Sequence, residues 1–306
     1  MTTELAAFLA RAESLLARVE ALLPPAPAAP DWSATAFRWR SRGGHHGHLE
    51  AVKHPHRIRL ADLQGIAEQK ARIERNTRQF VEGRSANNVL LTGARGTGKS
   101  SLIKGVLLKY AAKGLRLIEV DKSDLVHLPD IVDLIAPRPE RFIVFCDDLS
   151  FEASEPGYKA LKSILDGSIA GTPDNVLIYA TSNRRHLMPE YMAENLEAQR
   201  VGDEIHPGET VEEKISLSER FGLWLSFYPF DQDHYLAICE HWLRQFGVDE
   251  KLCGAVSSGT ALAARQEALQ WSLERGSRSG RVAWQFARDH AGRNGAAPAT
   301  KKRVAR

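Results

Sequence analysis

Eight residues near the end of the first third of the chain have the types and spacing that bind phosphate: Gly93-Ala-Arg-Gly-Thr-Gly-Lys-Ser100. The glycines carry no Cβ atoms, so backbone N–H groups can surround an anion at the start of a helix. Lys99 is expected to bridge the β- and γ-phosphates of a nucleotide, and the hydroxyl of Ser100 to bind Mg²⁺. A plain glycine-rich turn is the alternative. The residues expected to contact nucleotide are Gly93, Ala94, Arg95, Gly96, Thr97, Gly98, Lys99, Ser100 and Ser101.

Two carboxylates follow the apolar stretch 142–146, which has the length and composition of a buried strand. Such a strand would bring Asp147 beside the phosphate loop, where it can hold Mg²⁺ through water. Asp148 would orient or deprotonate the attacking water. The usual pair at this place is Asp-Glu, and aspartate is one methylene shorter, so we expect slow hydrolysis or the use of Glu152 instead. An ordinary acidic pair after a strand is the alternative.

A second buried strand, predicted at 176–180, ends in the polar sequence Thr-Ser-Asn183-Arg-Arg. A polar side chain at this strand end can lie next to the γ-phosphate and the attacking water, and Asn183 is our candidate; a simple loop asparagine is the alternative. Arg184 and Arg185 are more typical of surface, interface or nucleic-acid contacts. Together, the phosphate loop and the two strand ends predict three catalytic residues: Lys99, Asp148 and Asn183.

Short apolar strands alternate with helical patterns around these residues, which is typical of a parallel sheet covered by helices on both faces. We expect five strands, at 88–91, 115–120, 142–146, 176–180 and 223–227. After residue 231 the pattern is only helical. It predicts a smaller second domain with helices at 232–246, 258–274 and 279–289.

Taken together, these segments resemble the AAA+ ATPases over residues 60–290. Lys99, Asp147 and Asn183 match the positions called Walker A, Walker B and sensor 1 in that superfamily. The resemblance implies a P-loop NTPase fold of the ASCE/AAA+ type that binds ATP and Mg²⁺. The segment Leu63-Gln-Gly-Ile-Ala-Glu-Gln-Lys is similar to the one before the first core helix of that superfamily. The residues that would line the adenine pocket there are Gly65 and Ile66.

Two arginine segments extend the resemblance. Ser216-Leu-Ser-Glu-Arg220-Phe-Gly is similar to a segment of replication initiators and helicase loaders, in which the arginine reaches the γ-phosphate of a neighbouring subunit. This implies a homo-oligomer with Arg220 acting in trans, and the alternative is an ion pair with the acidic stretch 194–213. The segment 275–283 resembles the sensor-2 region of the helical lid. There Arg281 aligns best with the nucleotide-contacting arginine, and Arg278 second.

The chain is most similar to a bacterial family of stand-alone AAA+ ATP-binding proteins catalogued as a domain of unknown function. The stretches that carry this resemblance are NNVLLTGARGTGKSSL, FCDDLSFE, YATSNRRHL, EIHPGETVEEKISLSERFGLWLSFYPF and SGRVAWQF. We expect four parts: an N-terminal helix with a proline-rich and basic linker, a five-stranded α/β ATP-binding domain, an all-helical lid and a basic flexible tail. Their predicted bounds are 1–57, 58–229, 230–290 and 291–306.

The N-terminal part contains an amphipathic helix at 4–23, whose apolar residues recur every seven positions. The helix either docks on its own core or associates with itself or a partner. The proline-rich stretch 24–30 cannot continue it and predicts a stiff spacer. Residues 31–57 are basic and are expected to be irregular. Their histidines lack nearby acidic or cysteine partners, which favours a solvated loop over a metal site; they include His45, His46 and His48.

The composition, 43% hydrophobic and 26% charged, is that of a soluble globular protein, and no apolar run is long enough to span a membrane. The net charge of +3 hides a basic end, because residues 275–306 contain nine Lys and Arg against one acid. The N-terminus lacks the positive start of a secretory signal. The cysteines have no disulfide or metal spacing, which predicts reduced thiols in the cytoplasm: Cys146, Cys239 and Cys253.

The leading functional hypothesis is an ATPase switch that drives a conformational or assembly change in an unidentified protein client. An ATP-dependent docking module with negligible hydrolysis is one alternative, because of Asp148. A nucleic-acid loader or remodeller is another, with weak support from Arg220 and the basic end. A small-molecule kinase is disfavoured by the polar strand end and the helical lid. The segment 191–215 is either a substrate-contacting insertion or an acidic surface loop.

Overall fold

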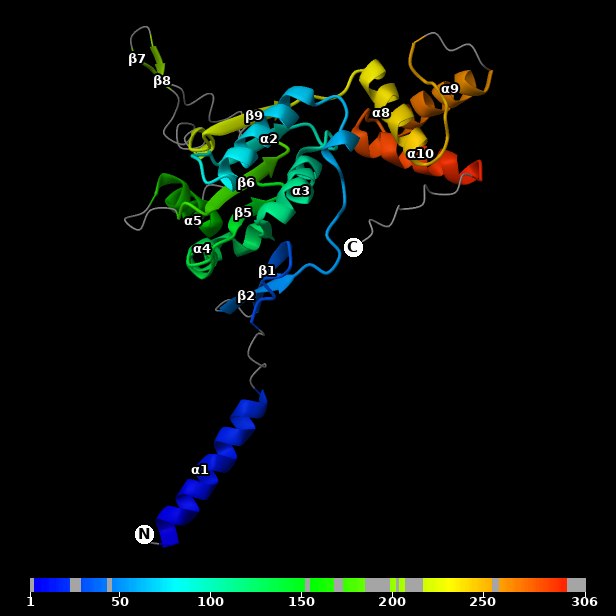
Figure 1. The fold of residues 1–306 in the computed structure, drawn as a ribbon. Coiled ribbons are helices and arrows are strands. Elements are labelled where there is room, and N and C mark those ends of the chain that lie inside the picture. The colour runs from blue at the N-terminus through cyan, green and yellow to red at the C-terminus, as the bar shows by residue number, and fades with distance from the viewer. Residues whose placement is uncertain are drawn as a thin grey trace. The chain divides into compact units, whose positions relative to one another are not determined.

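The computed structural model describes residues 3–22, 29–42, 46–151, 155–167, 173–184, 199–201, 204–206, 217–254 and 259–295. They belong to two compact units, Met1–Asp31 and Trp32–Arg306. The first unit contains α1 (Thr3–Leu22), which confirms the predicted N-terminal helix. The second contains a sheet, the helices around it and three C-terminal helices (Figure 1).

Several predictions lie outside the described residues. These concern Glu152, Arg185, His45 and the tail from residue 296 onward. Of the segment 191–215, the structure describes an antiparallel pair of short strands, β7 (Gln199–Val201) and β8 (Glu204–His206). Within the described part of the chain, every helix is too short or too polar to cross a membrane.

A seven-stranded sheet forms the centre of the second unit, in the order β2-β1-β4-β5-β6-β3-β9. The five predicted strands are all present and run parallel, which confirms the predicted α/β fold (Figure 1). Because β6 lies between β5 and β3, the residues that follow these three strands meet at one edge of the sheet. The strands are β1 (Ala36–Arg42), β2 (His46–Ala51), β3 (Val89–Gly93), β4 (Leu115–Glu119), β5 (Arg141–Cys146), β6 (Val176–Ser182) and β9 (Leu223–Phe227).

Two strands lie in the segment 31–57 that we expected to be irregular, so this expectation, and the count of five strands, are wrong. β1 pairs parallel with β4, and β2 returns antiparallel to β1. Phe37 and Trp39 are buried in the core on one side of β1. Arg38 lies between them and donates to the Glu119 carboxylate at 2.6 Å. Apolar and basic residues therefore alternate with the period of a strand that has one buried face.

Helices cover both faces of the sheet, and successive residues of a strand contact opposite layers. Leu91 and Tyr179 belong to the core that contains α2 and α3, whereas Leu90 and Ile178 belong to the core that contains α4 and α5. The α-helices are α2 (Ala67–Val81), α3 (Lys99–Tyr110), α4 (Leu128–Ile135) and α5 (Pro156–Asp166). Short 3₁₀ helices span Leu60–Asp62, Ala111–Lys113 and Lys122–His127.

The lid contains the three predicted helices, α8 (Gln232–Gln245), α9 (Gly259–Glu274) and α10 (Gly280–Arg293). The side chains of Asp231 and Ser279 cap α8 and α10 by accepting from a backbone N–H three residues further on. The hydroxyl of the buried Tyr235 donates to the carbonyl of Ala268 at 3.0 Å and joins α8 to α9. The domain boundaries given above stay predictions.

We expect Phe37→Ala to lower the free energy of unfolding by about 3–5 kcal/mol, because a buried aromatic ring leaves a cavity when it is removed. Arg40→Ala on the same strand is the matched control. Arg40 pairs with Glu50 in an exposed ion pair at 3.2 Å, so its loss costs less than about 1 kcal/mol. Urea unfolding of both variants measures the difference, and equal effects would show that β1 contributes no buried face.

Candidate nucleotide-binding site

The phosphate loop connects β3 to α3, which is the arrangement that the sequence predicts. The backbone has a positive φ of 119° at Gly93 and 73° at Gly96. A Cβ at Gly93 would lie 1.9 Å from the carbonyl oxygen of Phe227, and one at Gly96 would lie 2.8 Å from Cβ of Ser279. Both positions therefore require glycine, and the backbone turns tightly at each of them.

Lys99 is 6% exposed and lies inside this loop. Its Nζ donates to the carbonyls of Gly93 and Ala94, both at 2.8 Å, and to Oδ1 of Asn183 at 3.0 Å. Burial lowers the pKa of the Lys99 ammonium, and the neighbouring carboxylates oppose that change. Two predicted site residues that are far apart in the sequence, Lys99 and Asn183, are therefore in direct contact.

Asp147 and Ser100 are also in contact. The Ser100 hydroxyl donates to Oδ1 of Asp147 at 2.6 Å. The hydroxyl of Thr181, at the end of β6, donates to the same oxygen at 2.5 Å and accepts from the backbone N–H of Asp148 at 2.9 Å. Sequence reasoning missed Thr181, although its place in the polar end of a buried strand beside β5 is a usable signal.

Asp148 has a φ of 52°, a left-handed conformation that is uncommon outside glycine. Its carboxylate accepts from the side-chain amide of Asn183. Asn183 in this way joins Asp148 to Lys99, and the proposed water-positioning residues form one network with the phosphate loop. Asp147 and Asp148 are both exposed, so a nucleotide and water can reach them.

The predicted adenine-pocket residues lie against the other side of the loop. A Cβ at Gly98 would be 3.5 Å from Cδ1 of Ile66, and one at Gly65 would be 2.9 Å from the ring of Phe230. The ammonium of Lys70 donates to the carbonyl of Leu63 at 3.0 Å and to that of Leu60, just before this segment, at 3.1 Å. Phe230 was not expected in the site; it follows the end of β9 at Phe227, after Tyr228 and Pro229.

The start of α10 touches the phosphate loop. The N–H of Gly280 donates to the carbonyl of Gly96 at 2.9 Å, and Arg281 follows it in the chain. Arg278 and Arg281 are exposed. Arg278 lines a cleft of about 560 Å³ between loop and lid. The other residues lining this cleft are Ala94, Arg95, Thr97, Pro229, Phe230, Ser272, Leu273, Gly276, Ser277 and Ser279. Ser101 lies in the first turn of α3.

Arg220 forms an ion pair within the chain, with Asp166 at the end of α5. The predicted action of Arg220 on a neighbouring subunit stays a prediction. The alternative, an ion pair with the stretch 194–213, also stays a prediction, because apart from 199–201 and 204–206 that stretch lies outside the described residues. Arg184 is exposed, in keeping with a surface position.

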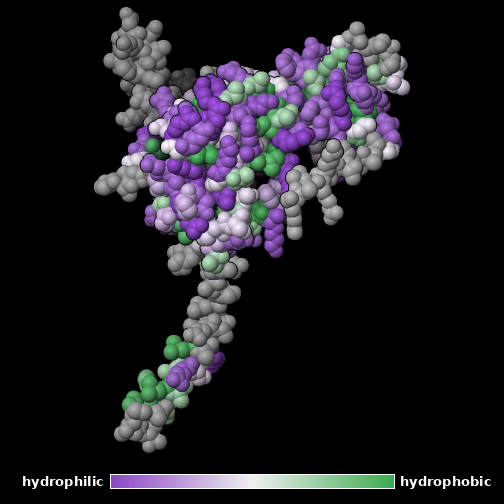
Figure 2. Space-filling model, viewed as in Figure 1, coloured by the Kyte–Doolittle hydropathy of each residue, from purple (hydrophilic) through white to green (hydrophobic). Residues whose placement is uncertain are grey.

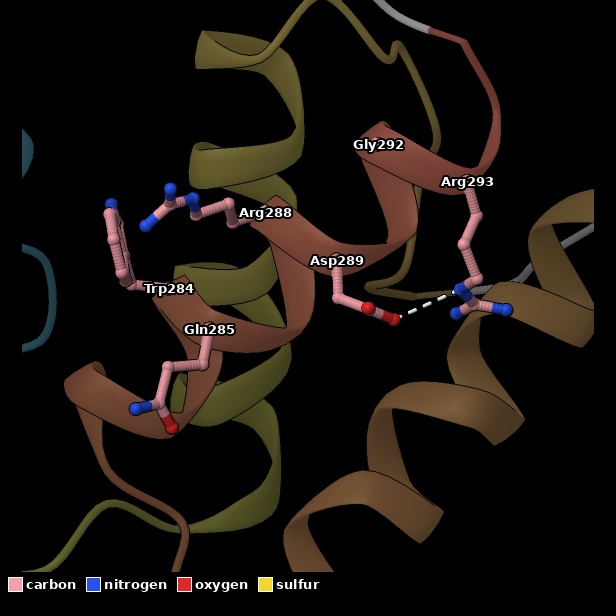
Figure 3. Close-up of a pocket in the computed structure, with 6 residues that line it drawn as sticks. All are labelled: Trp284, Gln285, Arg288, Asp289, Gly292 and Arg293. Atoms are coloured by element: carbon pink, nitrogen blue, oxygen red, sulfur yellow. Dashed lines mark hydrogen bonds and ion pairs between the residues drawn. The ribbon is translucent and has the colours of Figure 1, made fainter.

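A second hollow, of about 580 Å³, lies along α10 (Figure 3). Arg293 and Asp289 form a hydrogen-bonded ion pair at one end of it, at 2.9 Å. None of its lining residues belongs to the predicted site: Trp284, Gln285, Arg288, Asp289, Gly292 and Arg293.

A phosphate loop between β3 and α3, an acid after β5, an asparagine after β6 and three C-terminal helices give the chain a P-loop fold of the AAA+ type. Residues 32–294 match the family described as "Protein of unknown function (DUF815)". The chain belongs to this family, which confirms the resemblance to a family of unknown function. No curated protein matches the sequence.

Solved structures with a similar chain include the Aeropyrum pernix ORC1 protein in complex with DNA. It is 17% identical with a TM-score of 0.50, and the match covers 76% of this chain and 61% of ORC1. Caenorhabditis elegans PCH-2 is 15% identical with a TM-score of 0.46, over 76% and 71% of the two chains. The Thermotoga maritima RuvB Holliday junction branch migration motor is 13% identical with a TM-score of 0.38, over 76% and 71%. The ORC1 match shows a shared fold.

The left-handed backbone at Asp148 predicts different stabilities for two truncations of its side chain. Asp148→Gly is expected to be more stable than Asp148→Ala by roughly 1 kcal/mol, because alanine is strained at a positive φ. Both variants lose the same carboxylate, so each serves as the control for the other. Thermal and urea unfolding measure the difference; an alanine variant at least as stable as the glycine variant would contradict this backbone conformation.

Proposed function

We propose that this protein binds ATP with Mg²⁺ at the phosphate loop, hydrolyses it, and uses the change to alter the conformation or assembly of a protein partner. The observation that carries the proposal is the network around Lys99. It joins the phosphate loop to Asn183 and, through Asn183, to Asp148. A lysine with a purely structural role would not require a neighbouring asparagine and carboxylate. Phosphate binding and water activation require the ammonium, the amide and the carboxylate close together.

The residues present fit a magnesium ion. Oγ of Ser100 and Oδ1 of Asp147 lie 2.6 Å apart, and Mg²⁺ prefers oxygen ligands of these kinds together with water. Thr181 restrains the carboxylate of Asp147 by a hydrogen bond. Ser100 and Asp147 would hold the ion, which supplies charge neutralisation for the phosphates of the nucleotide.

Lys99 provides a link between nucleotide binding and conformation. Its ammonium is satisfied by two carbonyls and the Asn183 amide oxygen. A phosphate oxygen accepts stronger, charge-assisted hydrogen bonds, so a bound nucleotide would draw the ammonium away from these groups. Asn183 would then be free to hold a water together with Asp148, and Gly65, Ile66, Arg278 and Arg281 would contact the rest of the nucleotide.

A second candidate function is ATP-dependent docking of a partner with negligible hydrolysis. The observation that favours it is the geometry of Asp148, which has the shorter carboxylate, a positive φ and a hydrogen bond to Asn183. Steady-state phosphate release separates the two functions. Release well above that of a Lys99→Ala variant excludes the docking-only function.

We expect Lys99→Ala to weaken ATP binding about 10–100-fold, because it removes a charged hydrogen bond to the phosphates worth about 1.5–3 kcal/mol. Lys109→Ala on the same helix is the matched control; this lysine pairs with Glu74 instead of lying in the loop. Titration with a fluorescent ATP analogue measures both affinities. An unchanged affinity in Lys99→Ala would refute the site.

For Arg220, we propose a role as an arginine finger that acts on a neighbouring copy in a homo-oligomer. Arg220→Ala is then expected to lower hydrolysis about 10³-fold or more and to leave ATP affinity unchanged. Asp166→Asn is the control, because it removes the Arg220–Asp166 ion pair and keeps the guanidinium in place. Equal losses in both variants would assign Arg220 a structural role.

Mixing two inactive variants tests whether Arg220 acts in trans. Arg220→Ala retains Lys99, and Lys99→Ala retains Arg220, so some interfaces of the mixture contain both residues. We expect phosphate release to reappear on mixing. A mixture as inactive as its components would contradict action in trans.

A further inference from the structure

Helix α1 has large apolar side chains on its surface. Five of them are 45–68% exposed: Leu5, Phe8, Leu9, Leu15 and Leu16. Figure 2 shows hydrophobic residues on the surface of this helix. Single exposed leucines are ordinary in proteins, but a contiguous group of this size on one helix marks an interaction surface.

The spacing of these residues indicates that the partner is another helix. Phe8 and Leu15 are seven residues apart, and so are Leu9 and Leu16. A straight α-helix drifts by about 20° over seven residues, so a strict seven-residue repeat stays in register only with helices that supercoil around it. Leu5 lies between these two rows, which makes the stripe three positions wide. The seam of a two-stranded coiled coil is two positions wide, so this stripe has room for more than one neighbour.

The charges at the edges of the stripe indicate which helix fits. Arg11 and Arg18 lie along one edge, and Glu13 lies along the other. In the sequence, Glu20 comes seven residues after Glu13. When identical helices lie parallel around an axis, the arginine edge of each helix faces the glutamate edge of the next. In an antiparallel pair this edge would face itself, so Arg11 would meet Arg11 and Arg18 would meet Glu4, and no arginine would face the edge that contains Glu13. The helix is therefore complementary to parallel copies of itself.

We propose that α1 is a self-association helix that forms a parallel bundle with α1 of other copies of this chain. This goes beyond the proposed ATPase, because the bundle needs neither nucleotide nor Lys99. It also provides the neighbouring copy that an arginine finger requires. Rotational symmetry gives every copy the same surroundings, so each would have one such neighbour.

The full chain is to be studied by sedimentation velocity and light scattering at about 1–100 μM, without nucleotide, in the wild type and in Lys99→Ala. We expect both to be oligomers, and Leu9→Glu/Leu16→Glu to be a monomer with unchanged thermal unfolding of the second unit. Ala10→Glu/Ser14→Glu is the matched control, since it adds the same charge to the opposite side of α1 and should keep the wild-type mass.

A monomeric wild type, or a wild-type mass in Leu9→Glu/Leu16→Glu, would overturn the proposal. A loss of ATP turnover in Lys99→Ala without a change of mass would support self-association through α1. The self-association proposal and the ATPase proposal can therefore fail separately. Orientation is tested by charge reversal. Arg11→Glu/Arg18→Glu should weaken association at least about 10-fold, and adding Glu13→Arg/Glu20→Arg should restore it. Failure of Glu13→Arg/Glu20→Arg to restore association would instead indicate antiparallel helices, in which that edge does not face positions 11 and 18.

Discussion

The buried ammonium of Lys99 sets the strictest requirement in this structure. A charge removed from water must be matched by polar partners, and here two loop carbonyls and the amide oxygen of Asn183 supply them. The loop can reach the ammonium only by turning tightly, which requires glycine at 93 and 96. Asn183 can reach it only because β6 pairs directly with β3. The loop sequence and the strand order thus meet the same electrostatic need.

The same edge of the sheet concentrates the polar groups of the site, because the strands have no room for them elsewhere. The central strands are buried on both faces, so polar side chains gather where a strand ends. Thr181 is a clear case: its hydroxyl is fully engaged, donating to Asp147 and accepting from the N–H of Asp148. The two neighbouring carboxylates have different partners: that of Asp147 accepts from Ser100, and that of Asp148 accepts from Asn183.

The parts of the fold that follow from local sequence were predictable. The phosphate loop is contiguous, and buried parallel strands read as unbroken apolar runs, so both could be recognised. β1 was missed because its apolar residues Phe37 and Trp39 alternate with basic ones, and such a basic stretch resembles a solvated loop. The contacts of Thr181, Phe230 and Asp166 depend on how distant segments pack, which one-dimensional periodicity does not contain.

The lid, like the sheet, is joined to the loop by a direct hydrogen bond. The carbonyl of Gly96 accepts from Gly280 at the start of α10, and Ser279, which caps that helix, occupies the space where a Cβ of Gly96 would be. A loop that reshapes around phosphate must therefore keep this bond and carry α10 with it, or break the bond and leave a carbonyl unpaired. β3, paired on both sides, has no such freedom. A nucleotide-dependent change at the loop would accordingly reach α10 through this bond, as it reaches the end of β6 through Lys99 and Asn183.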